Sequence, residues 1–274
     1  MKKALTAGLM TFIFVTALSA HDMFLKLESF FLKPQTPATI SLFNGTFEKS
    51  ENAISRDRML DVSIVGPGSE RMHPDTSRWR DSGTMTLLDF KTGGEGTYVA
   101  GLSTKPRIIE LAAKDFNEYL AHDGVLDVLA ARQEKGEMNE DAAELYSKHV
   151  KTVFQVGQRR SEGFKTKLGY PIEIVPLQNP YQLGKGAALE VLIWKDDKPV
   201  ANQLVYASFA GYHKHDEAGG HVEAVKTRTD QNGIAKIKLA QSGYWYIRLI
   251  HMVPSDKEGV DYESNWATLT FEIK

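Results

Sequence analysis

The alternation of apolar and polar residues predicts short β-strands along most of the chain, separated by turns rich in Gly, Pro, Asn and Asp. In the first part, Asn44-Gly45 and Gly66-Pro67-Gly68 are strong turn signals that each end a strand. Strands are predicted there at residues 23–33, 39–43, 60–65, 84–90 and 97–102. Several short strands with this spacing are typical of an antiparallel sandwich.

The pattern changes to a helical spacing between residues 110 and 149. One face of the predicted helix is apolar, formed by Leu111, Phe116, Tyr119 and Leu120. Asn139 is predicted as the N-cap of a further helix over residues 140–149. His149 would end this helix, where its positive charge would interact favourably with the helix dipole. Residues 150–156 then return to a strand pattern, which predicts a helical insertion between strands.

A second β-rich unit begins after Gly169. Asp196-Asp197 is predicted as a hairpin turn between two alternating strands, and residues 229–233 form another turn. The predicted strands lie at residues 171–175, 189–194, 204–209, 235–239, 244–252 and 266–273. About seven strands in roughly 105 residues is the size of an immunoglobulin-like sandwich.

These patterns predict a mainly β protein with two β-sandwich-like parts and a helical insertion between them. The expected boundaries are 1–20 for a signal peptide, 21–109 for the N-terminal β-rich part, 110–149 for the helical insertion, 150–168 for a returning strand and linker, and 169–274 for the C-terminal β-sandwich.

The first twenty residues have the three-part pattern of a secretory signal peptide. Lys2-Lys3 precedes an apolar run over residues 4–17, which is shorter than the ~20 residues needed to span a bilayer. Cleavage after Ala20 makes His21 the new N-terminus, whereas cleavage after Ser19 does not. The sequence therefore predicts a periplasmic protein without a transmembrane segment after cleavage.

The absence of cysteine limits the chemistry of any metal site. Disulfides, a lipid-modified cysteine and thiolate ligands are excluded, so a transition metal must be held by imidazole, carboxylate, thioether or the terminal amine. Without the two lysines of the signal peptide, the formal net charge of −2 becomes −4. Because the basic residues are also dispersed, no nucleic-acid partner is expected.

Histidine is the most informative residue type. His213, His215 and His221 lie close together in the sequence, and on a strand His213 and His215 project from one face about 6.6 Å apart. Gly219-Gly220 favours a loop in which His221 folds back toward the other two. Neutral imidazoles are suitable ligands of nickel, cobalt, copper and zinc, whereas the alternative interpretation is a solvated polar loop.

Two further histidines are candidate ligands. His21, as a mature N-terminus, offers its amine and ring to one ion, as in the copper-binding histidine brace; otherwise it lies in a frayed chain end. His251 lies on an aromatic strand, where it is either a further ligand or a hydrogen-bonded packing residue.

Signatures of enzymes are weak. The chain has no serine nucleophile elbow and no thiol nucleophile, and its Gly-rich segments, such as Gly93-Gly94-Glu95-Gly96, are predicted turns rather than phosphate loops. This favours a protein without catalytic activity but leaves an enzyme open.

Residues 198–200, 229–233 and 243–248 resemble extracellular carboxypeptidase-regulatory or transthyretin-like β-sandwich modules. Six other segments carry a narrower resemblance: His21-Asp22-Met23-Phe24-Leu25, Leu42-Phe43-Asn44-Gly45-Thr46, Arg56-Asp57-Arg58, Tyr146-Ser147-Lys148-His149, Pro176-Leu177-Gln178-Asn179-Pro180-Tyr181 and Arg248-Leu249-Ile250-His251-Met252. With them the chain resembles the bacterial envelope proteins of the domain-of-unknown-function 4198 family, often found beside nickel and cobalt uptake systems.

Three functional hypotheses follow. The first is a periplasmic protein that binds a divalent transition metal (nickel, cobalt or copper), or an accessory protein of metal uptake with a membrane uptake system as its partner. The second is a copper-dependent oxygenase that uses His21 in a histidine brace. The third is a structural or interaction module whose histidines bind no metal.

Overall fold

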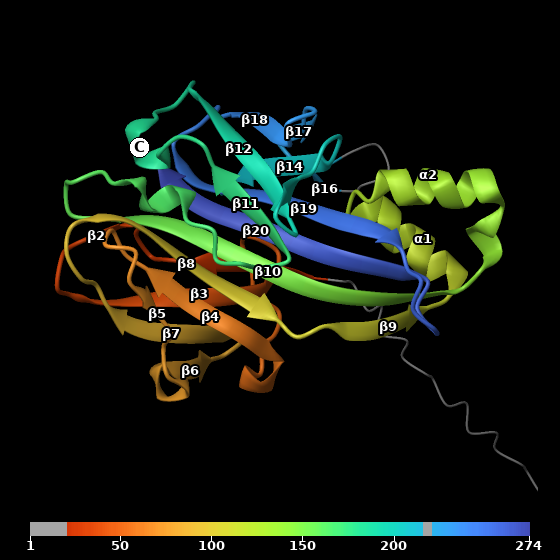
Figure 1. Ribbon diagram of the computed structural model, residues 1–274, viewed down its shortest axis with the longest axis horizontal. Helices are drawn as coiled ribbons and strands as arrows, with labels where there is room; N and C mark the ends of the chain where they lie inside the picture. The colour runs from red at the N-terminus through yellow and green to blue at the C-terminus, as the bar shows by residue number, and fades with distance from the viewer. Residues whose placement is uncertain (1–20, 216–220) are drawn as a thin grey trace, which may run out of the picture.

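The computed structural model describes residues 21–215 and 221–274, without the side chains of His215 and His221. The predicted signal peptide, Asp216 and Gly219-Gly220 lie outside the described residues. The described part of the chain is mainly β-structure, as predicted (Figure 1). Within it, no helix is long and apolar enough to cross a membrane.

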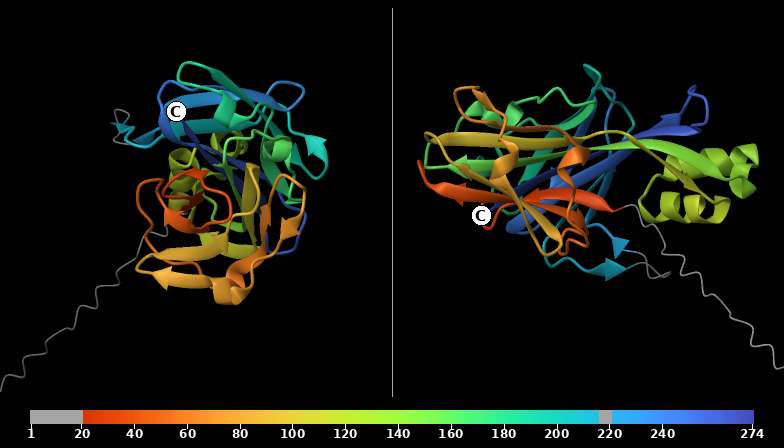
Figure 2. Two further views of the ribbon diagram at one scale, coloured as in Figure 1. Left: turned by 90° about the vertical axis from the view of Figure 1, so that its left-hand side faces the viewer. Right: turned by 90° about the horizontal axis from the view of Figure 1, so that it is seen from below.

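The strands form two sandwiches that share one continuous sheet (Figures 1 and 2). The shared sheet has ten strands in the order β17-β14-β19-β20-β10-β8-β4-β5, and β2 and β9 also pair with β10. Their bounds are β2 (Phe31–Leu32), β4 (Met59–Val65), β5 (Arg71–Met72), β8 (Gly96–Thr104), β9 (Arg107–Leu111), β10 (Ala142–Val156), β14 (Leu204–Phe209), β17 (Val225–Arg228), β19 (Gly243–Pro254) and β20 (Tyr262–Ile273).

Two smaller sheets cover opposite faces of the shared sheet. One contains β1 (Asp22–Lys26), β3 (Pro37–Gly45), β6 (Trp79–Ser82) and β7 (Met85–Lys91), and the other contains β11 (Ile172–Pro176), β12 (Ala188–Lys195), β13 (Lys198–Pro199) and β18 (Ile234–Lys238). On β10, Lys148 donates to the carbonyl of His21 beside β1, whereas Lys151 donates to Glu173 of β11. Because the two lysines are three residues apart on a strand, they point to opposite faces.

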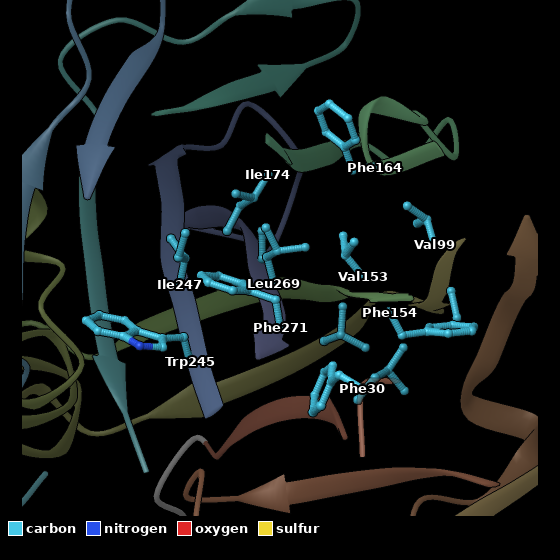
Figure 3. Packing of buried hydrophobic residues seen from close by; sticks show 14 of the residues in the cluster. Phe30, Val99, Val153, Phe154, Phe164, Ile174, Trp245, Ile247, Leu269 and Phe271 are labelled. Carbon is cyan, nitrogen blue, oxygen red and sulfur yellow. The ribbon is translucent and has the colours of Figure 1, made fainter. Parts of the chain in front are cut away.

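The hydrophobic core continues from one sandwich into the other (Figure 3). Trp245 on β19, Phe271 on β20 and Val99 on β8 belong to one buried cluster and are all fully buried. Val153 and Phe154 are neighbours on β10 and are both 0% exposed, so the shared sheet is buried on both faces at its centre. The two predicted β-rich parts therefore share a core.

The two helices, α1 (Ala113–His122) and α2 (Leu126–Lys135), lie together at one end of the shared sheet (Figure 1). Phe116 and Leu120 of α1 are fully buried and pack with Trp266 of β20 in a second, smaller core cluster. Gly136 ends α2 in the left-handed conformation, which favours glycine.

The short 3-10 helices are η1 (Arg56–Arg58), η2 (Thr76–Arg78), η3 (Glu137–Asn139), η4 (Glu162–Lys165) and η5 (Pro180–Gln182).

The predicted strands are present, except that the segment predicted as one strand over residues 23–33 is two strands, β1 and β2, in different sheets. Asp196 and Asp197 form the predicted hairpin turn with positive φ angles, but it joins β12 to the two-residue β13, whereas β14 pairs with β17 and β19. The helix predicted over residues 140–149 is wrong, because Ala142–Val156 is one strand, β10. This strand pairs with β20, β9 and β8, and these partners outweigh the local helix propensity of its first residues. The helical insertion thus spans residues 113–139 rather than 110–149, and the returning strand begins at Ala142.

Candidate metal centre

The five histidines predicted as metal ligands lie in three places in the fold. His21 directly precedes β1, and His251 lies on β19. His213, His215 and His221 belong to a hairpin made of β15 (Lys214–His215) and β16 (His221–Val222). Among the residues whose side chains are described, no group of three or more His, Asp or Glu side chains is arranged to hold a metal ion.

The hairpin pairs two of the predicted ligands through its backbone. In the antiparallel register of β15 and β16, His215 lies directly opposite His221, and Lys214 lies opposite Val222. Residues directly opposite on antiparallel strands have their Cβ atoms about 4.5–5.5 Å apart on the same face. His213 is exposed and stands two residues before His215. The backbone register therefore places two of the predicted ligand residues opposite each other.

Arg248 joins the base of this hairpin to the start of β1. Glu223 directly follows β16, and Asp22 directly follows His21. The Nε of Arg248 donates to Oε1 of Glu223 at 2.6 Å and lies 3.5 Å from Oδ2 of Asp22. The three side chains are largely buried, with exposed fractions of 8% for Arg248, 7% for Glu223 and 18% for Asp22. Burial raises the pKa of Asp22 to about 6, although the guanidinium of Arg248 acts in the opposite direction. The hairpin and His21 are thus anchored to the same cluster.

His21 is held on both its ring and its backbone. Its Nε2 lies 2.6 Å from Oε2 of Glu51, and its carbonyl accepts a hydrogen bond from Nζ of Lys148. In this chain His21 is therefore held in place at the start of β1, which begins at Asp22 and pairs with β3 along its whole length.

His251 lies on the other face of the shared sheet. It is three residues from Arg248 on β19, so the two side chains point to opposite faces. Its Nδ1 is 2.9 Å from Oε1 of Gln203, and burial lowers the pKa of the ring. The structure therefore separates His251 from the cluster that includes Asp22 and Arg248.

His149 is not the helix-terminal residue that the sequence predicts. It lies within β10, is 2% exposed, and has Nδ1 2.9 Å from Oγ of Ser103 and Nε2 3.1 Å from Oδ1 of Asn265. Burial lowers the pKa of this imidazole to about 4, so it is neutral near pH 7. Residues 144–149 show no regular alternation of apolar and polar residues, so the sequence offers no clear local signal for this strand.

A search among protein-family models matches residues 18–253 to the family described as "Domain of unknown function (DUF4198)". No curated protein matches the chain.

Solved structures give only distant similarities. The D0-D1 domain of intimin is 14% identical, with a TM-score of 0.21, and the match covers 91% of this chain and 97% of that chain. Trypsin-activated alpha-2-macroglobulin from Escherichia coli is 7% identical, with a TM-score of 0.27, covering 92% of this chain and 16% of that chain. A DUF4785 family protein from Legionella pneumophila is 9% identical, with a TM-score of 0.27, covering 84% and 52%. At these scores, none of the three bears on function.

Proposed function

Because this chain belongs to the DUF4198 family, whose description assigns no reaction, we propose its function from its own residues. We propose an exported, periplasmic protein that binds a divalent transition metal, nickel, cobalt or copper, and serves as an accessory to metal uptake. The hairpin of β15 and β16 is the proposed metal-binding element, and a membrane uptake system is the proposed partner.

The observation that carries this proposal is the register of His215 opposite His221. His215 and His221 are paired in the backbone of the hairpin, imidazole is a suitable ligand of nickel, cobalt and copper, and the exposed His213 offers a third nitrogen. The ion pair between Glu223 and Arg248 supports the base of the hairpin, because two-residue strands have little stability of their own. The ligands must lose their protons before they bind, so metal affinity should fall below about pH 6.5.

Replacing both His215 and His221 with glutamine should weaken the binding of Ni²⁺ or Cu²⁺ at least tenfold, a loss of about 1.4 kcal/mol or more. Titration calorimetry at pH 7.5 measures both affinities. The matched control replaces His73 and His122, whose side chains are 60% and 67% exposed and lie outside the hairpin, and should bind as the wild type does. Equal affinities for the two double variants would remove the hairpin from the site.

The copper-dependent oxygenase is a second candidate function, favoured by the ordered position of His21 beside Glu51. A histidine brace needs the free amine of His21, so protein isolated from the periplasm should begin at this residue. Intact-mass spectrometry tests the processing, and a chain that starts at Ala20 or retains residues 1–20 rules out the brace. If no transition metal binds at all, a structural or interaction module is the remaining function.

A further inference from the structure

A cavity of about 360 Å³ lies on the β1 side of the shared sheet, apart from the histidine hairpin. Its walls come from the start of β1, the segment leading into η1, β9, α1, β10 and β20. Figure 1 shows β9 and α1 beside this end of β10 and β20. The volume is within the range of about 300–1,000 Å³ that is usual for small-molecule sites.

Three cationic side chains line this cavity. Lys148 is 6% exposed, and its Nζ lies 4.7 Å from the ring centroid of Trp266. Arg58 is 9% exposed and donates to the hydroxyl of Tyr146 at 3.4 Å. Arg107 is the exposed member of the three and lies at the first residue of β9. Two of the cations are therefore buried against aromatic rings.

Glu144 is the carboxyl group among the lining residues. It is 2% exposed and accepts hydrogen bonds from the hydroxyl groups of Tyr119, at 3.2 Å, and Ser264. Burial raises the pKa of Glu144 above its ordinary value, although both hydrogen bonds act in the opposite direction. Even with Glu144 ionised, the three cations outnumber the one carboxyl group among the lining residues, so the charge that faces the cavity is positive.

The two buried lysines of β10 differ in their partners. Lys151, on the opposite face, donates to a buried carboxylate, Glu173, at 2.8 Å. Lys148 donates instead to the backbone carbonyl of His21. The buried amine of Lys148 is thus hydrogen-bonded to a neutral carbonyl group, and an anion in the cavity would stabilise its positive charge.

We propose that this cavity binds a small organic carboxylate, whose charged end contacts Lys148 and Arg58 and whose apolar or aromatic body packs against Trp266. Arg107 contributes attraction at the rim. Lys148 and Arg58 are the two buried cations of the lining, so a monoanion is favoured, because a second buried charge would lose its hydration without a further buried cation to pair with. This site is independent of the metal proposed at the hairpin.

Calorimetry on the mature chain, with EDTA present to remove hairpin metal, tests the proposal with benzoate, phenylacetate and hexanoate. Each carboxylate is compared with its uncharged amide of the same shape. At least one carboxylate should bind at least tenfold more tightly than its amide. The proposal is wrong if no carboxylate binds up to about 1 mM, or if each binds no better than its amide.

Three variants locate the binding. Lys148→Met should lose at least tenfold in carboxylate affinity and keep its weak affinity for the amide. Since Lys148 is buried, Arg107→Glu provides a second test at an exposed position and should also lose at least tenfold. Lys105→Glu is the matched control, because Lys105 is exposed, near Arg107 in sequence and outside the cavity. Equal losses in the Arg107 and Lys105 variants would indicate general charge attraction and overturn the site.

Discussion

Replacing Lys151 with methionine should lower the free energy of unfolding by about 3–5 kcal/mol, because the change leaves a buried carboxylate without its counter-charge. Nζ of Lys151 lies 2.8 Å from Oε2 of Glu173, and both side chains are 1% exposed. The pair links β10 to β11, and so joins the shared sheet to the smaller sheet that covers it.

Glu173 cannot readily escape this loss by taking up a proton. Its carboxylate accepts hydrogen bonds from the backbone N–H groups of Leu168, Gly169 and Tyr170, at 2.9, 2.8 and 3.2 Å. Although burial acts in the opposite direction, Lys151 and these amides hold the pKa of Glu173 below its ordinary value. The backbone N–H groups of residues 168–170 therefore point at an ionised carboxylate.

Urea unfolding at pH 7 measures the effect. Lys165→Met is the matched control, since Lys165 pairs with Glu162 at the surface with exposed fractions of 51% and 75%, and it should change stability by less than about 0.5 kcal/mol. Adding Glu173→Gln to Lys151→Met should recover part of the loss, because the buried charge is then removed. A loss of under about 1 kcal/mol for Lys151→Met contradicts the expectation.

The strands were predictable wherever local alternation and turn residues carry the information. β12, for example, alternates buried and partly buried residues and ends at the turn formed by Asp196 and Asp197. β10 was not predictable in the same way, because its parallel register places Glu144 opposite Tyr262, far apart in the sequence. No local pattern reports such a partner, and the residues that begin β10 form helices well.

The candidate sites were predictable to the extent that residue type and spacing determine them. Gly219-Gly220 predicted a loop in which His221 folds back toward the other two histidines, and the backbone register places His221 opposite His215. The buried charges of Lys148 and Arg248 were not predictable, because lysine and arginine side chains are almost never fully buried unless they are paired. Only the covering elements, which lie elsewhere in the sequence, bury these side chains.

The second large effect concerns acid stability and depends on His149. The pKa of this imidazole is about 4 in the folded protein, because burial lowers it from the ordinary value of 6.5. Between these pH values the unfolded chain binds a proton that the folded chain does not bind. The folded state therefore loses stability as the pH falls from 6.5 to 4, by about 3 kcal/mol from this residue.

Asp22 acts with the opposite sign in part of the same pH range. Its pKa is raised from 3.8 to about 6 in the folded protein, so between these values the folded chain binds more protons than the unfolded chain. Stability from Asp22 therefore increases as the pH falls through this range, which offsets part of the loss from His149. The wild-type pH profile alone cannot separate the two residues, whereas a variant of one of them can.

His149→Gln keeps a polar side chain beside Ser103 and Asn265 but removes the titration. The stability of the wild type relative to this variant, from urea unfolding, should fall by about 3 kcal/mol between pH 7 and pH 4. His122→Gln should show a smaller difference of opposite sign, because a hydrogen bond from the ring of the largely exposed His122 to the carboxylate of Asp123 raises the pKa of His122. Stability from His122 is present at low pH and is lost as the pH rises through its folded pKa. If the stability of the wild type relative to His149→Gln stays constant from pH 7 to pH 4, the imidazole has the same pKa in the folded and unfolded states. The interior between β10, β8 and β20 then does not hold it neutral.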